Sequence, residues 1–248
     1  MRLEQCYARP VGIAENLQAV RERVAAACQR AGRTPDDVVI VAVSKTFPPA
    51  LVAEACRAGL TDIGENRVQE AAAKIPQVEA LGSQPRWHLV GHLQTNKVKT
   101  ALGLFDIIHS VDSLRLAEAI SRQAETMSRQ QDGPVPILLE VNVGGEASKF
   151  GFTPAEAGRT VEQMARLPGL AVQGLMTVAP LSADPEEVRP VFRELRRLRD
   201  ALGLRHLSMG MTDDFEVAIE EGATMVRVGR AIFGPREPAW EWARPEGK

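Results

Sequence analysis

Hydrophobic positions in the first part of the chain change from a helical period to a strand-like run. Between residues 11 and 31, apolar side chains recur at intervals of three and four, and Gly32 follows as a stop signal. This spacing predicts an amphipathic helix over residues 11–31. Residues 38–43 are then apolar without interruption and mostly β-branched. Such a run is typical of a strand buried on both faces, as in a parallel sheet.

Short apolar runs and helical patterns alternate through the rest of the chain. Further strands are predicted at residues 61–63, 86–91, 105–111, 136–143, 170–178, 206–209 and 224–228. Helices are predicted at residues 68–81, 95–101, 113–129 and 185–202, and from residues 154 and 213 onward. At the last of these, Asp213 and Glu216 have the spacing of a capping box.

About eight strand–helix units can be counted from Val38, which is the number a (β/α)8 barrel requires. The sequence therefore predicts an α/β fold, a single TIM barrel with residues 11–31 as an extra N-terminal helix. A doubly wound open sheet is the competing architecture, but no GxGxxG motif follows the first strand. No linker-like tract divides the chain, so we expect one domain over residues 1–248, with a tail at residues 237–248.

Composition narrows the class of protein. The 248 residues include 30 basic and 32 acidic side chains, for a formal net charge of -2, and 44% are hydrophobic. A balanced charge argues against a binder of nucleic acid or of anionic membranes, which would carry a basic excess. The apolar fraction is that of a globular protein rather than a disordered one.

Cysteine usage and the N-terminus bear on the compartment. Cys6, Cys28 and Cys56 form no CxxC pair and leave an odd thiol, which favours a reducing environment. The N-terminus lacks an apolar core of signal-peptide length, and no apolar stretch reaches the roughly 18 residues of a membrane span. We expect a cytoplasmic, monomeric protein that does not associate with membranes.

Lys45 is the first candidate for chemistry. Only six of the thirty basic residues are lysines, and Lys45 follows the first buried run by two residues. Active sites of (β/α)8 barrels lie where strands end and loops begin. Partial burial lowers the pKa of a lysine and leaves more free amine to attack a carbonyl. Lys45 is therefore a candidate Schiff-base nucleophile, and the alternative is a solvated lysine at a strand end.

Two glycine-containing loops indicate a phosphate site. Residues 208–212 end the seventh predicted strand, and residues 229–234 end the eighth. Barrels often hold a phosphate with the loops after these two strands, through backbone N–H groups and a helix N-terminus. Either loop alone is explained equally well by glycines that turn the chain. Both loops together, at the two expected strands, favour phosphate binding.

Arg227 and two histidines are further candidates. Arg227 shares a strand face with Gly229, so its charge points into the barrel mouth or at an acid such as Glu65 or Glu140. His88 and His92 are four residues apart, but without further ligands we favour hydrogen bonding over metal binding and expect no metal site. A lysine and a phosphate site together fit an aldehyde that carries a phosphate. Pyridoxal 5′-phosphate (PLP) is one such ligand, and a sugar-phosphate aldolase substrate is another.

Many short blocks of the chain resemble one known family. The blocks are residues 43–46, 64–70, 87–97, 109–113, 149–152, 174–177, 207–214, 225–229 and 231–234. Together they resemble the pyridoxal phosphate homeostasis proteins, which look like the barrel domain of alanine racemase (PLP fold type III) standing alone. The resemblance covers residues 11–235. That family is associated with vitamin B6 and amino-acid homeostasis and generally lacks demonstrated enzyme activity.

The resemblance implies a set of cofactor-binding residues and no catalytic ones. Lys45 would form the Schiff base with PLP, and Arg227 would face the pyridine nitrogen. The phosphate would be held by Ser208, Met209, Gly229 and Arg230, and the cofactor would be lined by Asn66, His88 and Met176. Arg230 departs from the family, where a small hydroxyl residue is frequent after the glycine. It either supplies charge to the phosphate or points away.

Two features separate a PLP carrier from a PLP enzyme. A protonated arginine beside the pyridine nitrogen keeps that nitrogen unprotonated, and such a ring is a weaker electron sink. In alanine racemases a tyrosine from a second domain supplies the second base, but the single tyrosine here is Tyr7, outside the barrel pattern. We therefore expect a protein that buffers PLP and delivers it to apo-enzymes. The alternatives are a racemase-type enzyme, with His88 or a cysteine as second base, and an aldolase.

Overall fold

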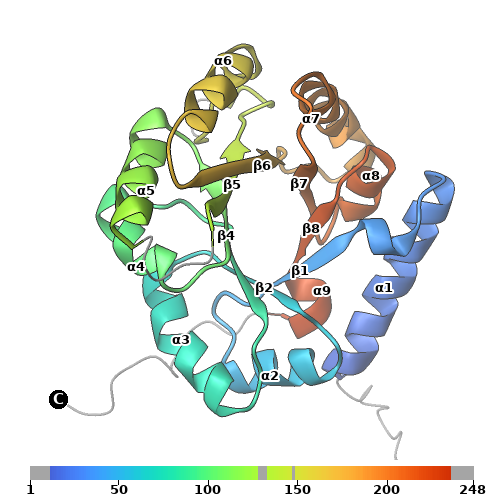
Figure 1. The fold of residues 1–248 in the computed structure, drawn as a ribbon. Coiled ribbons are helices and arrows are strands. Elements are labelled where there is room, and N and C mark those ends of the chain that lie inside the picture. The colour runs from blue at the N-terminus through green and yellow to red at the C-terminus, as the bar shows by residue number, and fades with distance from the viewer. Residues whose placement is uncertain (1–11, 128–132, 147–148, 236–248) are drawn as a thin grey trace, which may run out of the picture.

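Eight parallel strands close into a barrel in sequence order, and β1 pairs with β8 to complete the ring (Figure 1). The computed structural model describes residues 12–127, 133–146 and 149–235. The strands are β1 Val39–Val43, β2 Asp62–Glu65, β3 Arg86–Leu89, β4 Ile107–Val111, β5 Val135–Glu140, β6 Leu170–Met176, β7 His206–Met211 and β8 Met225–Val228. The predicted TIM barrel is confirmed, and the open-sheet alternative is wrong.

Helices surround the barrel on its outside (Figure 1). They are α1 Ile13–Arg30, α2 Pro49–Arg57, α3 Val68–Ala80, α4 Val98–Leu102, α5 Leu114–Met127, α6 Pro154–Ala165, α7 Arg189–Ala201, α8 Phe215–Glu220 and α9 Arg230–Phe233. Short 3₁₀ turns lie at Pro35–Asp37, Thr95–Lys97 and Pro185–Val188. Helices α2 and α9 had not been predicted, because both are short and their apolar positions complete few helical turns. No helix in the described residues is long and apolar enough to cross a membrane.

The predicted capping box at Asp213 is wrong. Helix α8 begins at Phe215, and the residue at its N-cap is Asp214. A carboxylate oxygen of Asp214 accepts a hydrogen bond from the backbone N–H of Met211, while Asp213 pairs with Arg230. The two carboxylates therefore bond groups in the loops that follow β7 and β8, rather than the backbone of the first turn of α8.

The barrel interior is partly polar. Its apolar cluster consists of Val41, Ile107, Leu138, Met176 and Met225. Polar side chains are buried there as well, among them Asp62, His88, His109, Ser208 and Arg227. Burying polar groups is costly unless they are hydrogen-bonded, so this set needs partners within the barrel.

Helix α1 packs against the short helices that follow β7 and β8. Its buried face includes Leu17 and Val24, and the helix contacts α8 and α9. The side-chain amide of Asn16 donates to the carbonyl oxygen of Ile232 at 3.1 Å, and the Arg23 guanidinium lies 4.4 Å from the ring centroid of Phe215. The extra helix thereby supports the short helices that follow β7 and β8.

Candidate functional site

A cavity of about 390 Å³ lies at the carboxyl ends of the strands. Five of the predicted site residues line it: Lys45, Asn66, Arg227, Gly229 and Arg230. The other lining residues are Val43, Val90, Val178, Leu181, Met211, Thr212 and Asp213. The tertiary structure thus brings together residues from β1, β2 and β8 that are far apart in the sequence.

Lys45 lies on the segment that leaves β1. The strand ends at Val43, Ser44 is buried, and Lys45 is half-buried at the cavity wall. Thr46 has a φ of 70°, a left-handed conformation that is uncommon for a residue other than glycine. The chain therefore turns sharply just after Lys45, and this turn leaves the lysine at the mouth of the barrel instead of on the first turn of α2.

Arg227 forms the floor of the cavity. Its Nη1 donates to the carbonyl oxygen of Ser208 at 2.8 Å and to Ser208 Oγ at 2.6 Å, and its Nη2 donates to the carbonyl oxygen of Thr177 at 2.8 Å. Burial lowers the pKa of Arg227 to about 10, against the attraction of Asp214 and Glu140, so the guanidinium stays charged near neutral pH. The alternative that Arg227 forms an ion pair with Glu65 is therefore wrong.

Ser208 and Met209 are not among the residues that line the cavity. Ser208 is fully buried, and its Oγ is bonded to His109 and Arg227. Met209 is also fully buried and packs in the outer apolar core. Strand β7 runs to Met211, two residues further than predicted, with a register shift against β8. The loop after β7 lines the cavity with Met211, Thr212 and Asp213, and phosphate binding by Ser208 and Met209 stays a prediction.

His88 and Met176 are also buried in the barrel interior and are not among the residues that line the cavity. His88 Nδ1 lies 2.9 Å from His109 Nε2, and its Nε2 lies 2.9 Å from Asp62 Oδ1. The predicted hydrogen-bonding role of His88 is confirmed, while its direct contact with a ligand stays a prediction. Asp62 and His109 had not been predicted as site residues, although each is a polar side chain within a predicted strand.

These contacts form one continuous chain of hydrogen bonds from Asp62 to Arg227. Despite burial, hydrogen bonds from His88, Thr61 and Arg86 lower the pKa of Asp62 to about 2, so its ionised carboxylate accepts a hydrogen bond from His88 Nε2. Burial holds the pKa of His109 well below its usual value, so this ring is neutral. Because a neutral histidine has one N–H and one lone pair, the His109 ring donates to one of its two neighbours, His88 and Ser208, and accepts from the other.

Arg230 and Asp213 pair across the cavity rim. Arg230 Nη2 lies 2.6 Å from Asp213 Oδ2, and both side chains are more than half exposed. The loops after β7 and β8 are joined by this contact. Arg230 thus places its charge at the rim, beside the predicted phosphate position, but this charge is already paired with Asp213.

Acidic and aromatic groups occupy another part of the barrel mouth. Burial and repulsion from Asp112 raise the pKa of Glu140 to about 7, with Arg227 opposing the shift. Asp112 Oδ2 lies 2.8 Å from Nδ1 of His92, whose ring stacks on Phe150 with centroids 4.1 Å apart. His92 and His88 therefore lie in separate environments, and the described residues contain no group of three or more side chains that could hold a metal ion.

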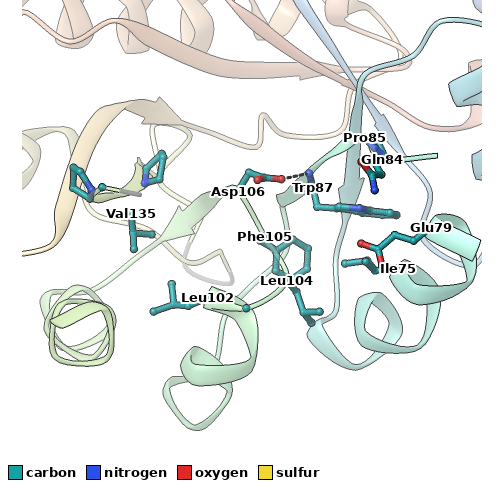
Figure 2. A pocket seen from close by; sticks show the side chains of 14 residues that line it. Ile75, Glu79, Gln84, Pro85, Trp87, Leu102, Leu104, Phe105, Asp106 and Val135 are labelled. Atoms are coloured by element: carbon teal, nitrogen blue, oxygen red, sulfur yellow. Dashed lines mark hydrogen bonds between the residues drawn. The ribbon is translucent and has the colours of Figure 1, made fainter. Parts of the chain in front are cut away.

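A second pocket, of about 450 Å³, lies at the amino ends of β3, β4 and β5 (Figure 2). Figure 2 shows Asp106, which accepts a hydrogen bond from the backbone N–H of Trp87 at 2.7 Å, near Phe105. This end of a (β/α)8 barrel generally serves stability rather than chemistry. The candidate site is therefore the cavity at the opposite end.

Comparison with known proteins gives consistent similarities. The family model described as alanine racemase, N-terminal domain, matches residues 16–237. A pyridoxal phosphate homeostasis protein of Aquifex aeolicus is 46% identical over 229 residues, which cover 90% of this chain and 98% of the relative. A protein of the same name from Pseudomonas aeruginosa is 44% identical over 227 residues, covering 91% of this chain and 96% of the relative.

Solved structures agree in fold. PipY of Synechococcus elongatus, solved with PLP bound, is 37% identical and has a TM-score of 0.77. The match covers 90% of this chain and 100% of PipY. Alanine racemase of Clostridium difficile 630 is 14% identical with a TM-score of 0.68, over 92% of this chain and 57% of that one. At that identity the likeness to the racemase concerns the fold alone.

Proposed function

Because the chain belongs to the family of pyridoxal phosphate homeostasis proteins, we propose that it binds PLP in the cavity at the carboxyl ends of the strands. It holds the cofactor as a Schiff base on Lys45, buffers it, and delivers it to apo-enzymes without turnover of its own. The observation that carries the proposal is a single cavity lined by Lys45, Arg227 and the loops after β7 and β8. A monomeric state and a cytoplasmic location stay predictions.

The donor groups of the cavity fit the three ends of PLP. The amine of Lys45 suits the aldehyde, the guanidinium of Arg227 suits the pyridine nitrogen, and the backbone around Thr212 and Gly229 suits the phosphate. A side chain at Gly229 would lie 3.0 Å from the carbonyl oxygen of Val43. Glycine at this position therefore allows β1 and β8 to approach each other closely, and it leaves this wall of the cavity without a side chain.

Lys45 supplies the covalent attachment. Its Nζ forms a bond to the aldehyde carbon, the carbon–oxygen bond breaks, and the oxygen leaves as water with the two amine protons. No oxidant or reductant takes part. The bond is reversible by water, which suits a protein that must release its ligand.

Arg227 favours holding the ligand over reacting with it. Three of the five N–H groups of its guanidinium are directed at Ser208 and Thr177, which fixes the side chain. With a pKa of about 10 it remains a proton donor near neutral pH, so the pyridine nitrogen facing it accepts a hydrogen bond and stays unprotonated. Bound PLP supplies an electron-withdrawing ring, and an unprotonated nitrogen weakens that property.

One observation favours a second candidate, a racemase-type enzyme. Such an enzyme needs an acid–base group on the side of the cofactor away from the lysine. Glu140 ends β5, which lies across the eight-stranded ring from β1, and its pKa of about 7 suits proton transfer near neutral pH. The chain's only tyrosine, Tyr7, lies outside the described residues.

Absorption spectroscopy tests the first candidate. Protein mixed with PLP is expected to show the band of a protonated Schiff base, and Lys45→Ala is expected to lose that band while Lys149→Ala keeps it. Loaded protein should then restore an apo-enzyme faster than free PLP at a matched concentration. Protein that shows no Schiff-base band with added PLP would overturn the proposal. Exchange of the α-proton of an L-amino acid in deuterium oxide, abolished by Lys45→Ala and Glu140→Gln, would favour the racemase instead.

A further inference from the structure

The segment that carries Lys45 rests on a buried charged cluster, which consists of Lys74, Glu65 and Glu70. Lys74 and Glu65 are completely buried, and Glu70 is 7% exposed. Lys74 Nζ forms an ion pair with Glu65, and a second with Glu70 at 3.0 Å. The cluster joins the end of β2 to α3, behind the barrel wall and outside the cavity.

The cluster holds the backbone on both sides of Lys45. On one side, Lys74 Nζ donates to the carbonyl oxygen of Ser44 at 2.7 Å, and Ser44 Oγ donates to Glu65 Oε1 at 2.6 Å. On the other side, the backbone N–H of Thr46 donates to Glu70 Oε1 at 2.6 Å. The peptides before and after Lys45 are therefore both tied to the same three side chains.

One of those ties acts on a strained residue. Thr46 has a φ of 70°, and a β-branched residue in this region is held there by its surroundings rather than by its own preference. The Glu70 carboxylate accepts the N–H of Thr46, and a hydrogen bond to a charged acceptor is stronger than one between neutral groups. Glu70 therefore stabilises the sharp turn that follows Lys45.

Stability alone does not account for such a cluster. Removing a lysine and two carboxylates from water costs so much that well-packed apolar residues of similar volume are often as stable or more so. The helix α3 otherwise buries apolar side chains such as Ala71, Ile75 and Val78 on this face. The charged residues are thus placed where they contact the segment around Lys45, which apolar residues could pack against but could not hold by hydrogen bonds.

We propose that Lys74, Glu65 and Glu70 are positioning residues that hold the Ser44–Thr46 backbone so that the amine of Lys45 meets the aldehyde of the ligand. This inference rests on the proposed function, because it assigns a role to Lys45 as the site of Schiff-base formation. The three residues act through Lys45 and touch no ligand themselves.

The test compares two ligands that differ in the aldehyde. PLP can form a Schiff base, whereas pyridoxine 5′-phosphate has an alcohol at that position and can bind only through the ring and phosphate. In Glu70→Ala the Thr46 N–H loses its acceptor, and the apparent equilibrium constant for Schiff-base formation is expected to fall about tenfold. The dissociation constant for pyridoxine 5′-phosphate is expected to change by less than about twofold, since Glu70 does not line the cavity and is hydrogen-bonded to Thr46 and Lys74.

Two variants serve as controls. Glu70→Gln keeps an oxygen that can accept from Thr46 and should recover most of the Schiff-base formation. Glu221→Gln alters a carboxylate of the same 7% exposure, which pairs with Arg189 and Arg193, and should behave as the unmodified protein does. If Glu70→Ala weakens both ligands equally, or neither, the positioning role is wrong.

Ser44→Ala gives a second, milder test if Glu70→Ala does not fold. It removes one hydrogen bond to Glu65 and leaves all three charges in place. It should also lower Schiff-base formation with PLP and spare pyridoxine 5′-phosphate, and an unchanged Schiff-base constant contradicts the inference. The unmodified protein separates the two proposals: if it forms no Schiff base with PLP, the proposed function fails, whereas normal formation in every variant overturns the positioning role alone.

Discussion

Arg227 Nη1 lies 2.6 Å from Ser208 Oγ, and this contact links the floor of the cavity to a buried chain of polar side chains. Beyond Ser208 the chain continues through His109 and His88 to Asp62. Arg86, which is exposed, pairs with Asp62 at 2.8 Å at the amino end of the barrel. The polar interior therefore connects a surface residue at one end with the candidate site at the other.

Ser208→Ala is expected to destabilise the protein by about 1–3 kcal/mol, because it leaves both His109 Nδ1 and a guanidinium N–H of Arg227 short of a buried partner. Urea unfolding followed by circular dichroism measures the effect. Ser182→Ala is the matched control, since its hydroxyl bonds Glu187 at the exposed surface. Equal stability of the two variants would contradict the buried chain.

Asp62 is expected to stabilise the fold at neutral pH and to lose this effect in acid. Although burial opposes it, hydrogen bonds from His88, Thr61 and Arg86 lower the pKa of Asp62 to about 2 from 3.8. A lowered pKa contributes stability above the unfolded value, and that contribution disappears as the pH falls from about 4 to 2.

Unfolding free energies of the unmodified protein and Asp62→Asn should therefore differ by about 2 kcal/mol near pH 7 and converge near pH 2. The exposed Asp36→Asn should follow the unmodified protein throughout. A difference for Asp62→Asn that does not shrink in acid would show that the carboxylate charge is not the cause.

Glu140 should have the opposite pH dependence. Burial and then repulsion from Asp112 raise its pKa to about 7 from 4.5, with Arg227 opposing. A carboxyl group that resists ionisation in the folded state makes folding less favourable as the pH rises from about 4.5 to 7. Relative to the unmodified protein, Glu140→Gln should gain about 2–3 kcal/mol between pH 4.5 and pH 8, measured by urea unfolding at both pH values. If the unfolding free energies of the two proteins change equally between these pH values, the prediction is wrong.

Gly210→Ala is expected to be strongly destabilising. Gly210 has a φ of 88°, and an added Cβ would lie 2.5 Å from the Cβ of Ala218 and 2.9 Å from the Cα of Phe215. Overpacking of this kind should cost about 2–4 kcal/mol in unfolding free energy. Gly203→Ala is the control, because it has a φ of 63° but no atom within 4 Å, so only the backbone strain of about 1 kcal/mol applies. If the two variants unfold at the same urea concentration, β7 and α8 are not in close contact at Gly210.

The sequence alone determined the barrel and the strand ends that carry Lys45, Arg227 and Gly229. Those features are local: β-branched runs encode buried strands, helical periods encode the covering helices, and a reactive side chain just after a strand is visible in the printed order. The cavity brings these residues together, as parallel strands require. The short helices α2 and α9 were not predicted, because they complete few helical turns.

Only the tertiary structure decided which side chains face the cavity and which face the interior. The structure buries Ser208 and Met209 and places Met211, Thr212 and Asp213 at the cavity wall, two residues beyond the predicted end of β7. The chain from Asp62 through His109 and the cluster around Lys74 join residues from different strands and helices. Such contacts depend on strand register and barrel closure, which place distant residues side by side, and no periodicity along the chain encodes them.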